Sequence, residues 1–272
     1  MTRLATIAAA AALLATAAAP PAEAQTTPWF DTVGGAVRLV VEPPAPDAET
    51  IRGALEIELD QGWKTYWREP GSSGIPPQVE IGHSRGIGAV AIGFPAPVWI
   101  ENPYGDFAGY DAPVALPLTF TRTANGAAEL VADVFLGICE DICIPVQTRF
   151  ELKVEPANGS TLDGMRVARA HDRLPGSPHE GFSLAEEDEA GLIAVDHRAA
   201  GKTPPAVFVH ARDGTQFLPP IHVGTRDGVS RYRLEPVRPS PDGRAVDTVV
   251  TVRAGEHAFE ASHEVRLAGE NR

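Results

Sequence analysis

Residues that build metal sites and catalytic nucleophiles are scarce in this chain of 272 residues. It has 2 cysteines and 2 methionines, and one of the methionines is Met1. Two thiolates without a neighbouring methionine or histidine make an incomplete site for a soft metal. The G-x-S-x-G pattern of a serine hydrolase is absent, so the sequence does not indicate that nucleophile.

The histidines of the second half lack the spacing of metal ligands. We interpret them as surface or strand-face residues; they are His197, His210, His222, His257 and His263.

Positive charge is also scarce, with 23 Lys and Arg against 36 Asp and Glu and a net charge of −13. An acidic chain repels phosphate backbones, so we expect no nucleic-acid partner. Long apolar runs are absent after residue 19, which predicts no membrane span in the rest of the chain.

Residues 1–24 have the pattern of a secretory signal peptide. Arg3 precedes an apolar run rich in alanine, and Ala22-Glu23-Ala24 forms a cleavage site before Gln25. We therefore expect an exported, periplasmic protein that is soluble after cleavage. A cysteine pair is oxidised by default in that compartment.

The abundance of turn residues, with 26 Gly and 25 Pro, indicates a chain of many short strands. The fold class predicted is all-β, with two immunoglobulin-like β-sandwich domains in tandem. The expected divisions are a first sandwich at 30–156, a linker with a short helix at 157–180, and a second sandwich at 181–269. Strands are predicted at 36–41, 55–60, 78–81, 89–94, 114–122, 130–136, 146–154, 192–195, 206–210, 216–218, 230–234, 246–252 and 257–267.

The loops of the first half follow its turn residues. Residues 69–77 and 101–110 are predicted to be long loops, and Asn125-Gly126 is the strongest hairpin-turn signal in the chain. Trp63, Tyr66 and Trp67 are predicted to be packing residues.

Cys139 and Cys143 lie between two strand-like segments, which predicts a β-hairpin with the cysteines facing each other. Opposed residues of an antiparallel pair have Cα atoms about 4.5 to 5.5 Å apart, which a disulfide tolerates. The bond would close a small loop and stabilise the chain little. A redox-active pair, an inert disulfide and a metal-binding pair all remain open at this point.

Three segments resemble the amino-terminal periplasmic domain of the DsbD family of thiol:disulfide interchange proteins. They read LDQGWKTYWREPGSSGIPP at 59–77, GYDAPVALP at 109–117 and CEDICIP at 139–145. The cysteine spacing is closer than in DsbD itself, so the sequence is more similar to the ScsB-like branch. The resemblance covers roughly residues 33–155, and the second half fits the ScsB-type periplasmic region less closely.

The resemblance implies an immunoglobulin-like domain whose Cys139 and Cys143 exchange electrons as a disulfide, without a cofactor. Its partners would be thioredoxin-fold periplasmic proteins, including factors of cytochrome c maturation, and a membrane-embedded thiol donor. That donor is expected on a separate chain, because no membrane domain follows here. In the cap loop of the family, the residue shielding the disulfide would be Tyr104 or Phe107.

Glu140 and Asp141 lie between the cysteines, where negative charge disfavours a thiolate. The alternative is that they only form a solvated turn. Three functions follow: a thiol–disulfide interchange component acting as a protein-disulfide reductase, a copper-binding module linked to copper tolerance, and a non-catalytic adaptor with an inert disulfide. The sequence leaves the oligomeric state unknown.

Overall fold

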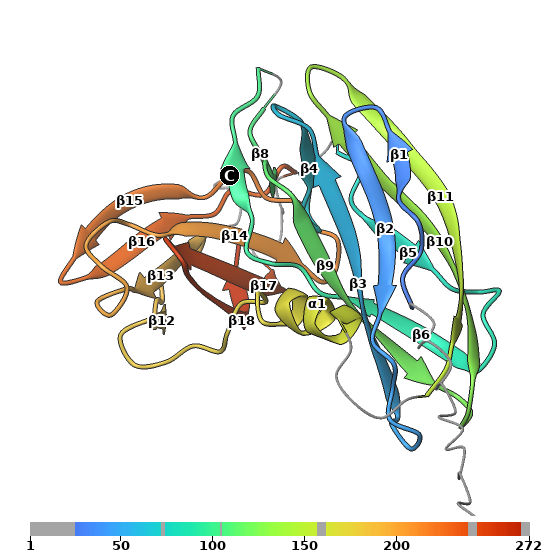
Figure 1. The fold of residues 1–272 in the computed structure, drawn as a ribbon. Helices are drawn as coiled ribbons and strands as arrows, with labels where there is room; N and C mark the ends of the chain where they lie inside the picture. Colours follow the sequence, from blue (N-terminus) through green and yellow to red (C-terminus); the bar gives the residue numbers. More distant parts are fainter. Residues whose placement is uncertain (1–24, 72–73, 104, 157–161, 239–243, 268–272) are drawn as a thin grey trace, which may run out of the picture.

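A computed structural model describes residues 25–71, 74–103, 105–156, 162–238 and 244–267 (Figure 1). The expected signal peptide lies outside these residues. The described chain is almost entirely β, as predicted, and no helix in it is long and apolar enough to cross a membrane. Its elements are β1 (Phe30–Thr32), β2 (Gly35–Val41), β3 (Thr50–Leu59), β4 (Lys64–Tyr66), β5 (Gln78–Glu80), β6 (Ile87–Ile92), β7 (Val98–Ile100), β8 (Phe107–Tyr110), β9 (Val114–Arg122), β10 (Ala128–Cys139), β11 (Cys143–Val154), α1 (Leu162–His171), β12 (Ser183–Ala185), β13 (Leu192–Asp196), β14 (Ala206–Ala211), β15 (Ile221–Arg226), β16 (Val229–Arg233), β17 (Ala245–Ala254) and β18 (His257–Arg266).

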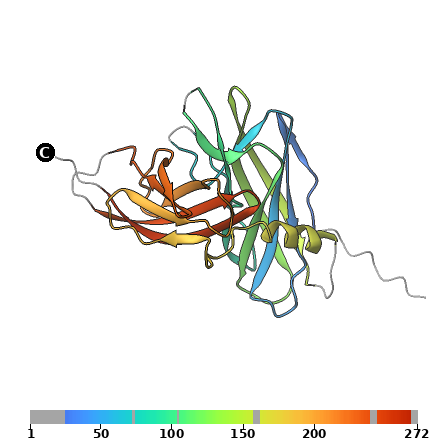
Figure 2. The ribbon, with the colours of Figure 1, turned by 90° about the vertical axis from the view of Figure 1, so that its left-hand side faces the viewer.

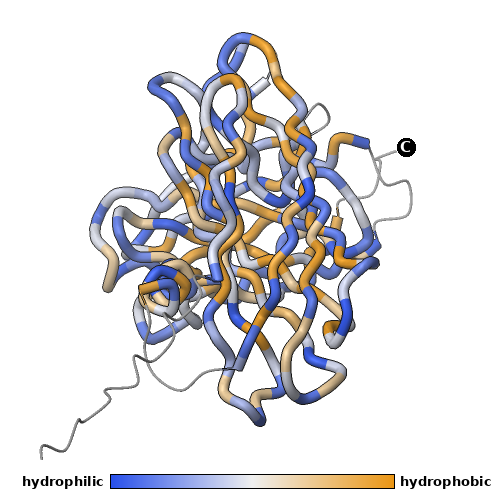
Figure 3. The backbone as a smooth tube through the Cα atoms, turned by 45° about the vertical axis from the view of Figure 1, so that its right-hand side comes forward, coloured by the Kyte–Doolittle hydropathy of each residue, from blue (hydrophilic) through white to orange (hydrophobic). Residues whose placement is uncertain are grey.

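The first sandwich consists of β1 to β11. One sheet has the strand order β1-β2-β3-β9-β6, and the other has β11-β10-β4-β8-β7 with β5 also paired to β10. Apolar and polar residues alternate along these strands, as Figure 3 shows, so each sheet turns one apolar face inward. The core between the sheets includes the fully buried Leu55, Leu116, Phe120 and Leu130.

The predicted loop at 101–110 is wrong in its last four residues, which form the buried strand β8. Gly109 in this strand reflects close packing and not a turn. A Cβ atom on Gly109 would lie 2.5 Å from the carbonyl oxygen of Thr65 on β4, so only glycine fits there. Three-residue strands such as β4 and β7 are too short to show periodicity, and the sequence did not indicate them.

The Asn125-Gly126 turn does not form a hairpin. It follows β9, which pairs with β3 and β6, and precedes β10, which lies in the opposite sheet. The turn therefore carries the chain from one sheet to the other. Dipeptide preference reports the local backbone conformation, here a positive φ of 90° at Gly126, but not which strands pair.

The second sandwich consists of β12 to β18, with strand orders β12-β13-β16-β15 and β14-β17-β18. Its own core includes Phe182, Val250 and Phe259. The predicted strand at 216–218 is reduced to a single bridge between Phe217 and Pro236. Strand β15 was not predicted, because its side chains are mostly exposed and show no alternation.

The segment between the sandwiches is held on the first one. The short helix expected within 157–180 forms as α1, and its buried Val167 and Ala170 pack against Val40 and Ala54. The sandwiches also share apolar packing, since Phe208 of β14 is fully buried in the first core. Figures 1 and 2 show the second sandwich beside the first, with its strands running across the direction of the strands of the first.

Candidate functional site

The two cysteines close the hairpin formed by β10 and β11. These strands pair in continuous register from Ala128 and Val154 to Cys139 and Cys143. Cys139 and Cys143 are directly opposite, with a Cα–Cα distance of 4.1 Å, and form a disulfide. The predicted hairpin and the facing of its cysteines are confirmed. The register places the bond at the end of a long, rigid ladder.

The two cysteines differ in exposure. Cys139 has 5% of its surface exposed, whereas Cys143 begins β11 as an exposed residue. Ile142, between them in sequence, is 70% exposed, which is unusual for a large apolar side chain. A protein that approaches this tip therefore meets Cys143 and Ile142 before it meets Cys139.

A small apolar cluster covers the buried side of the disulfide. It contains Tyr66, Ile100, Phe107 and Cys139. The rings of Tyr66 and Phe107 have centroids 4.8 Å apart. Phe107, expected in the cap loop, lies in β8 instead, and Tyr104 lies outside the described residues. A shielding role for Phe107 stays a proposal, supported by its place in this cluster.

Tyr66 contacts both sulfur atoms. Its hydroxyl oxygen lies 2.8 Å from Cys143 Sγ and 3.3 Å from Cys139 Sγ. Because disulfide sulfurs carry no proton, the hydroxyl is the donor in this state. Burial raises the pKa of Tyr66, so the phenol stays protonated. Tyr66 is buried, as predicted, but its polar contact with the sulfurs was missed. No local pattern reports a contact between residues 77 positions apart.

Strand β4 fixes Tyr66 beside the hairpin. Thr65 pairs with Ile138, and its hydroxyl donates a hydrogen bond of 2.8 Å to the carbonyl oxygen of Gly137. A Cβ atom on Gly137 would lie 3.1 Å from the Tyr66 ring. Gly137 therefore makes room for that ring within the ladder.

Glu140 and Asp141, the predicted modulating residues, are both exposed. The backbone amide of Glu140 donates a 3.3 Å hydrogen bond to the carbonyl oxygen of Ile142, which tightens the turn. Their effect on the thiolate stays a prediction. Within the described ranges, no group of three or more His, Cys, Asp or Glu side chains is placed to hold a metal ion.

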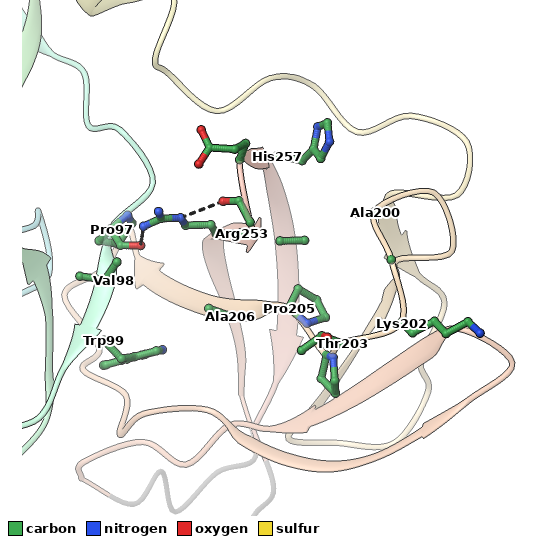
Figure 4. Close-up of a pocket in the computed structure, with 15 residues that line it drawn as sticks. Pro97, Val98, Trp99, Ala200, Lys202, Thr203, Pro205, Ala206, Arg253 and His257 are labelled. Carbon is green, nitrogen blue, oxygen red and sulfur yellow. Dashed lines mark hydrogen bonds between the residues drawn. The ribbon is translucent and has the colours of Figure 1, made fainter.

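A separate cavity of about 640 Å³ lies between the two sandwiches (Figure 4). Trp99, Pro205, Arg253 and His257 are among its lining residues. Arg253 donates to the carbonyl oxygens of Pro97, at 3.1 Å, and Gly255, at 3.2 Å. Neither cysteine lines this cavity, so it is distinct from the disulfide site.

The interpretation of the histidines as surface or strand-face residues is wrong for His197, which follows β13 and is buried. His197 is 1% exposed, and its ring nitrogens contact the Gly201 carbonyl oxygen at 3.0 Å and the Ser230 hydroxyl at 2.9 Å. Both nitrogens are thus occupied inside the core.

Residues 36–155 match the family described as "Thiol:disulfide interchange protein DsbD, N-terminal". No curated protein matches the chain significantly. Among solved structures, the chain is similar to the crystal structure of the N-terminal periplasmic domain of ScsB from Proteus mirabilis. The TM-score is 0.71 at 19% identity, over 90% of this chain and 100% of that chain. The family match confirms the resemblance found in the sequence, and the similarity of fold extends to the second sandwich.

Proposed function

We propose, from the match of residues 36–155 to the DsbD N-terminal family, that the chain relays electrons by thiol–disulfide exchange. The single observation that carries the proposal is the asymmetric disulfide. One sulfur belongs to an exposed residue, the other to a buried one, and a tyrosine hydroxyl contacts both.

Reduction of the pair follows from this geometry. A thiolate of the donor attacks Cys143 Sγ, the Cys139–Cys143 bond breaks, and Cys139 leaves as a thiolate. The second donor thiol, once deprotonated, then attacks the mixed disulfide and releases Cys143. The donor dithiol has become a disulfide, and Cys139 and Cys143 have gained two electrons and, after protonation, two protons.

Delivery reverses these steps toward an acceptor. The Cys143 thiolate attacks the acceptor disulfide, and Cys139 then resolves the mixed disulfide, so the acceptor leaves as a dithiol and the pair is oxidised again. Tyr66 lies where its O–H can stabilise either thiolate, because both sulfurs are within 3.3 Å of its oxygen. Charge-assisted hydrogen bonds of this kind are stronger than neutral ones.

The partners belong to the same proposal. The acceptors are thioredoxin-fold proteins of the periplasm, and the donor is a membrane-embedded thiol protein. The exposed Ile142 beside Cys143 gives such partners an apolar contact at the point of exchange. Glu140 and Asp141 limit reaction with other thiols, because their charge disfavours a free thiolate.

Trapping of mixed disulfides tests the proposal. Cys139→Ser leaves the exposed Cys143 thiol without its resolving partner, so we expect it to accumulate a mixed disulfide with an oxidised thioredoxin-fold protein. Cys143→Ser leaves only the buried thiol and should trap about tenfold less, because rate follows access.

The reduction potential of the Cys139–Cys143 pair is the second readout. Exchange disulfides lie at roughly −270 to −120 mV, whereas inert structural ones lie below about −300 mV. Absence of trapping by both variants, or a wild-type pair that titrates only below about −300 mV, would contradict the relay and favour an adaptor with an inert bond.

A further inference from the structure

The four residues Tyr66 to Glu69 connect the disulfide to the second sandwich. Tyr66 contacts Cys143, and the next three residues contact β14 and β18. We propose that the second sandwich positions the Tyr66 hydroxyl, with Arg68 and Glu260 as positioning residues for the exchange reaction. The inference rests on the proposed function, and it assigns a role to the second sandwich.

The contact of Arg68 with Glu260 is the strongest part of this connection. The two guanidinium Nη atoms lie 2.9 and 3.5 Å from the two carboxylate oxygens of Glu260. The side chains are 20% and 28% exposed, so water screens the pair only partly. The guanidinium also lies 5.0 Å from the ring centroid of Trp67 and 5.1 Å from that of Phe94. The guanidinium of Arg68 is therefore held by Glu260 of the second sandwich and lies close to two aromatic rings of the first.

Glu260 is itself fixed by a row of residues across the sheet of β14, β17 and β18. Phe208 pairs with Thr251, and Thr251 pairs with Glu260, so all three lie on one face. The Thr251 hydroxyl donates to Glu260 Oε2 at 2.8 Å. At the other end of the row, the Phe208 ring lies 5.9 Å from that of Trp67. One face of the second sandwich thus contacts both Trp67 and Arg68.

His210 of the second sandwich makes a third contact with the segment that follows Tyr66. His210, two residues after Phe208 and on the same face of β14, places Nδ1 3.5 Å from Glu69 Oε2. Three consecutive residues after Tyr66 therefore contact side chains from the second sandwich, and the hydrogen bonds of Arg68 are the strongest of these contacts. A shift of the backbone after Tyr66 would change these contacts.

Tyr66 is sensitive to such a shift, because hydrogen bonds weaken steeply with distance and misalignment. In the reduced pair its hydroxyl donates to the Cys143 thiolate and favours the dithiol over the disulfide. Displacement of the hydroxyl should therefore move the equilibrium toward the disulfide and raise the pKa of the Cys143 thiol. Loss of the Arg68–Glu260 contact should have this effect only while the hydroxyl is present.

A double-mutant cycle on the full chain tests this dependence. The variants are Tyr66→Phe, Glu260→Gln and the two combined, and the readouts are the equilibrium of the pair with dithiothreitol and the pH dependence of Cys143 alkylation. Tyr66→Phe should shift the equilibrium toward the disulfide about tenfold, which is about 30 mV. Glu260→Gln should shift it about threefold in the same direction, and by less than about 1.5-fold when Tyr66 is already Phe.

The matched control is Glu187→Gln, which removes the ion pair with Arg231 in the second sandwich, 2.7 Å long, on the other sheet. It should behave as wild type. If Glu260→Gln does not fold, Arg68→Lys serves instead, because lysine keeps the charge but cannot span both oxygens. Arg68→Lys should shift the equilibrium in the same direction, again only when the hydroxyl is present.

A Glu260→Gln effect that is absent, or equal with and without the Tyr66 hydroxyl, would overturn the positioning role. Failure of the proposed function would give a different result. In that case the wild-type cysteine pair would not exchange with a thioredoxin-fold protein. The double-mutant cycle with dithiothreitol would still report whether Glu260 acts through Tyr66.

Discussion

At the scale of single residues, the two cysteines of the disulfide differ in their exposure to solvent. Cys143 is exposed at the start of β11, while Cys139 is buried against Tyr66 and Phe107. In the proposed exchange, a partner attacks the sulfur of Cys143, and Cys139 is the leaving group in a sheltered site. The Tyr66 hydroxyl contacts both sulfurs, so one hydrogen-bond donor can stabilise the attacked sulfur and the leaving sulfur.

The acidic residues between the cysteines yield a prediction at this scale. In Glu140→Gln, and in Asp141→Asn, removal of a negative charge should favour the Cys143 thiolate and speed its alkylation at pH 7 about two- to threefold. The measurement is the rate of iodoacetamide reaction at low and high salt. Because both residues are exposed, the gain should shrink at high salt.

Asp133→Asn is the control for that experiment. Asp133 is an acidic residue of the same hairpin that is paired with Arg149 at 2.7 Å, many residues below the tip in the ladder. It should leave the alkylation rate unchanged. Equal rates for Glu140→Gln, Asp141→Asn and wild type would mean that the two acids only form a solvated turn.

At the scale of elements, helix α1 anchors the connecting segment through one apolar stripe. Val167 is fully buried against Val40 and Ala54, while Met165 on the same helix is 57% exposed. Val167→Ala should lower the free energy of unfolding by about 1 to 2 kcal/mol, since buried methyl groups are lost and a cavity remains. Urea denaturation of the full chain measures it.

Met165→Ala is the matched control and should change stability by less than about 0.5 kcal/mol. A Val167→Ala variant as stable as Met165→Ala would show that α1 does not anchor the segment to the first sandwich.

Elements with a strong periodic pattern were predictable from the sequence. The strand predicted at 114–122 has the bounds of β9, and the hairpin of β10 and β11 formed around the cysteines. Among the three-residue strands, β5 was predicted at 78–81, whereas β4 and β7 were not, because so few residues carry little periodicity. The site was therefore foreseen only in part. The cysteines are visible in the sequence, whereas Tyr66 reaches them through the pairing of β4 with β10, which no local pattern encodes.

At the scale of the whole molecule, the two sandwiches are joined by an aromatic residue and not only by a linker. Phe208 of β14 is fully buried, with its ring 5.0 Å from that of Trp99 and 5.9 Å from that of Trp67. The first core is thus completed by a side chain from the second sandwich. Unfolding of the second sandwich would expose Trp67 and Trp99 to water.

This arrangement predicts that the two sandwiches unfold together. Phe208→Ala should cost about 3 to 5 kcal/mol, because it opens a cavity between two tryptophan rings. It should also split one denaturation transition into two, since Phe208 is the large apolar side chain of the second sandwich that is buried in the first core. Tryptophan fluorescence follows the first half of the chain, because all 4 tryptophans, Trp67 and Trp99 included, lie there, and circular dichroism follows both sandwiches. Phe217→Ala, at a half-buried phenylalanine of the second sandwich, should lower stability without splitting the transition. Coincident fluorescence and dichroism curves in Phe208→Ala would show that the remaining contacts, among them those of Arg68, Glu69 and Arg253, suffice to couple the sandwiches.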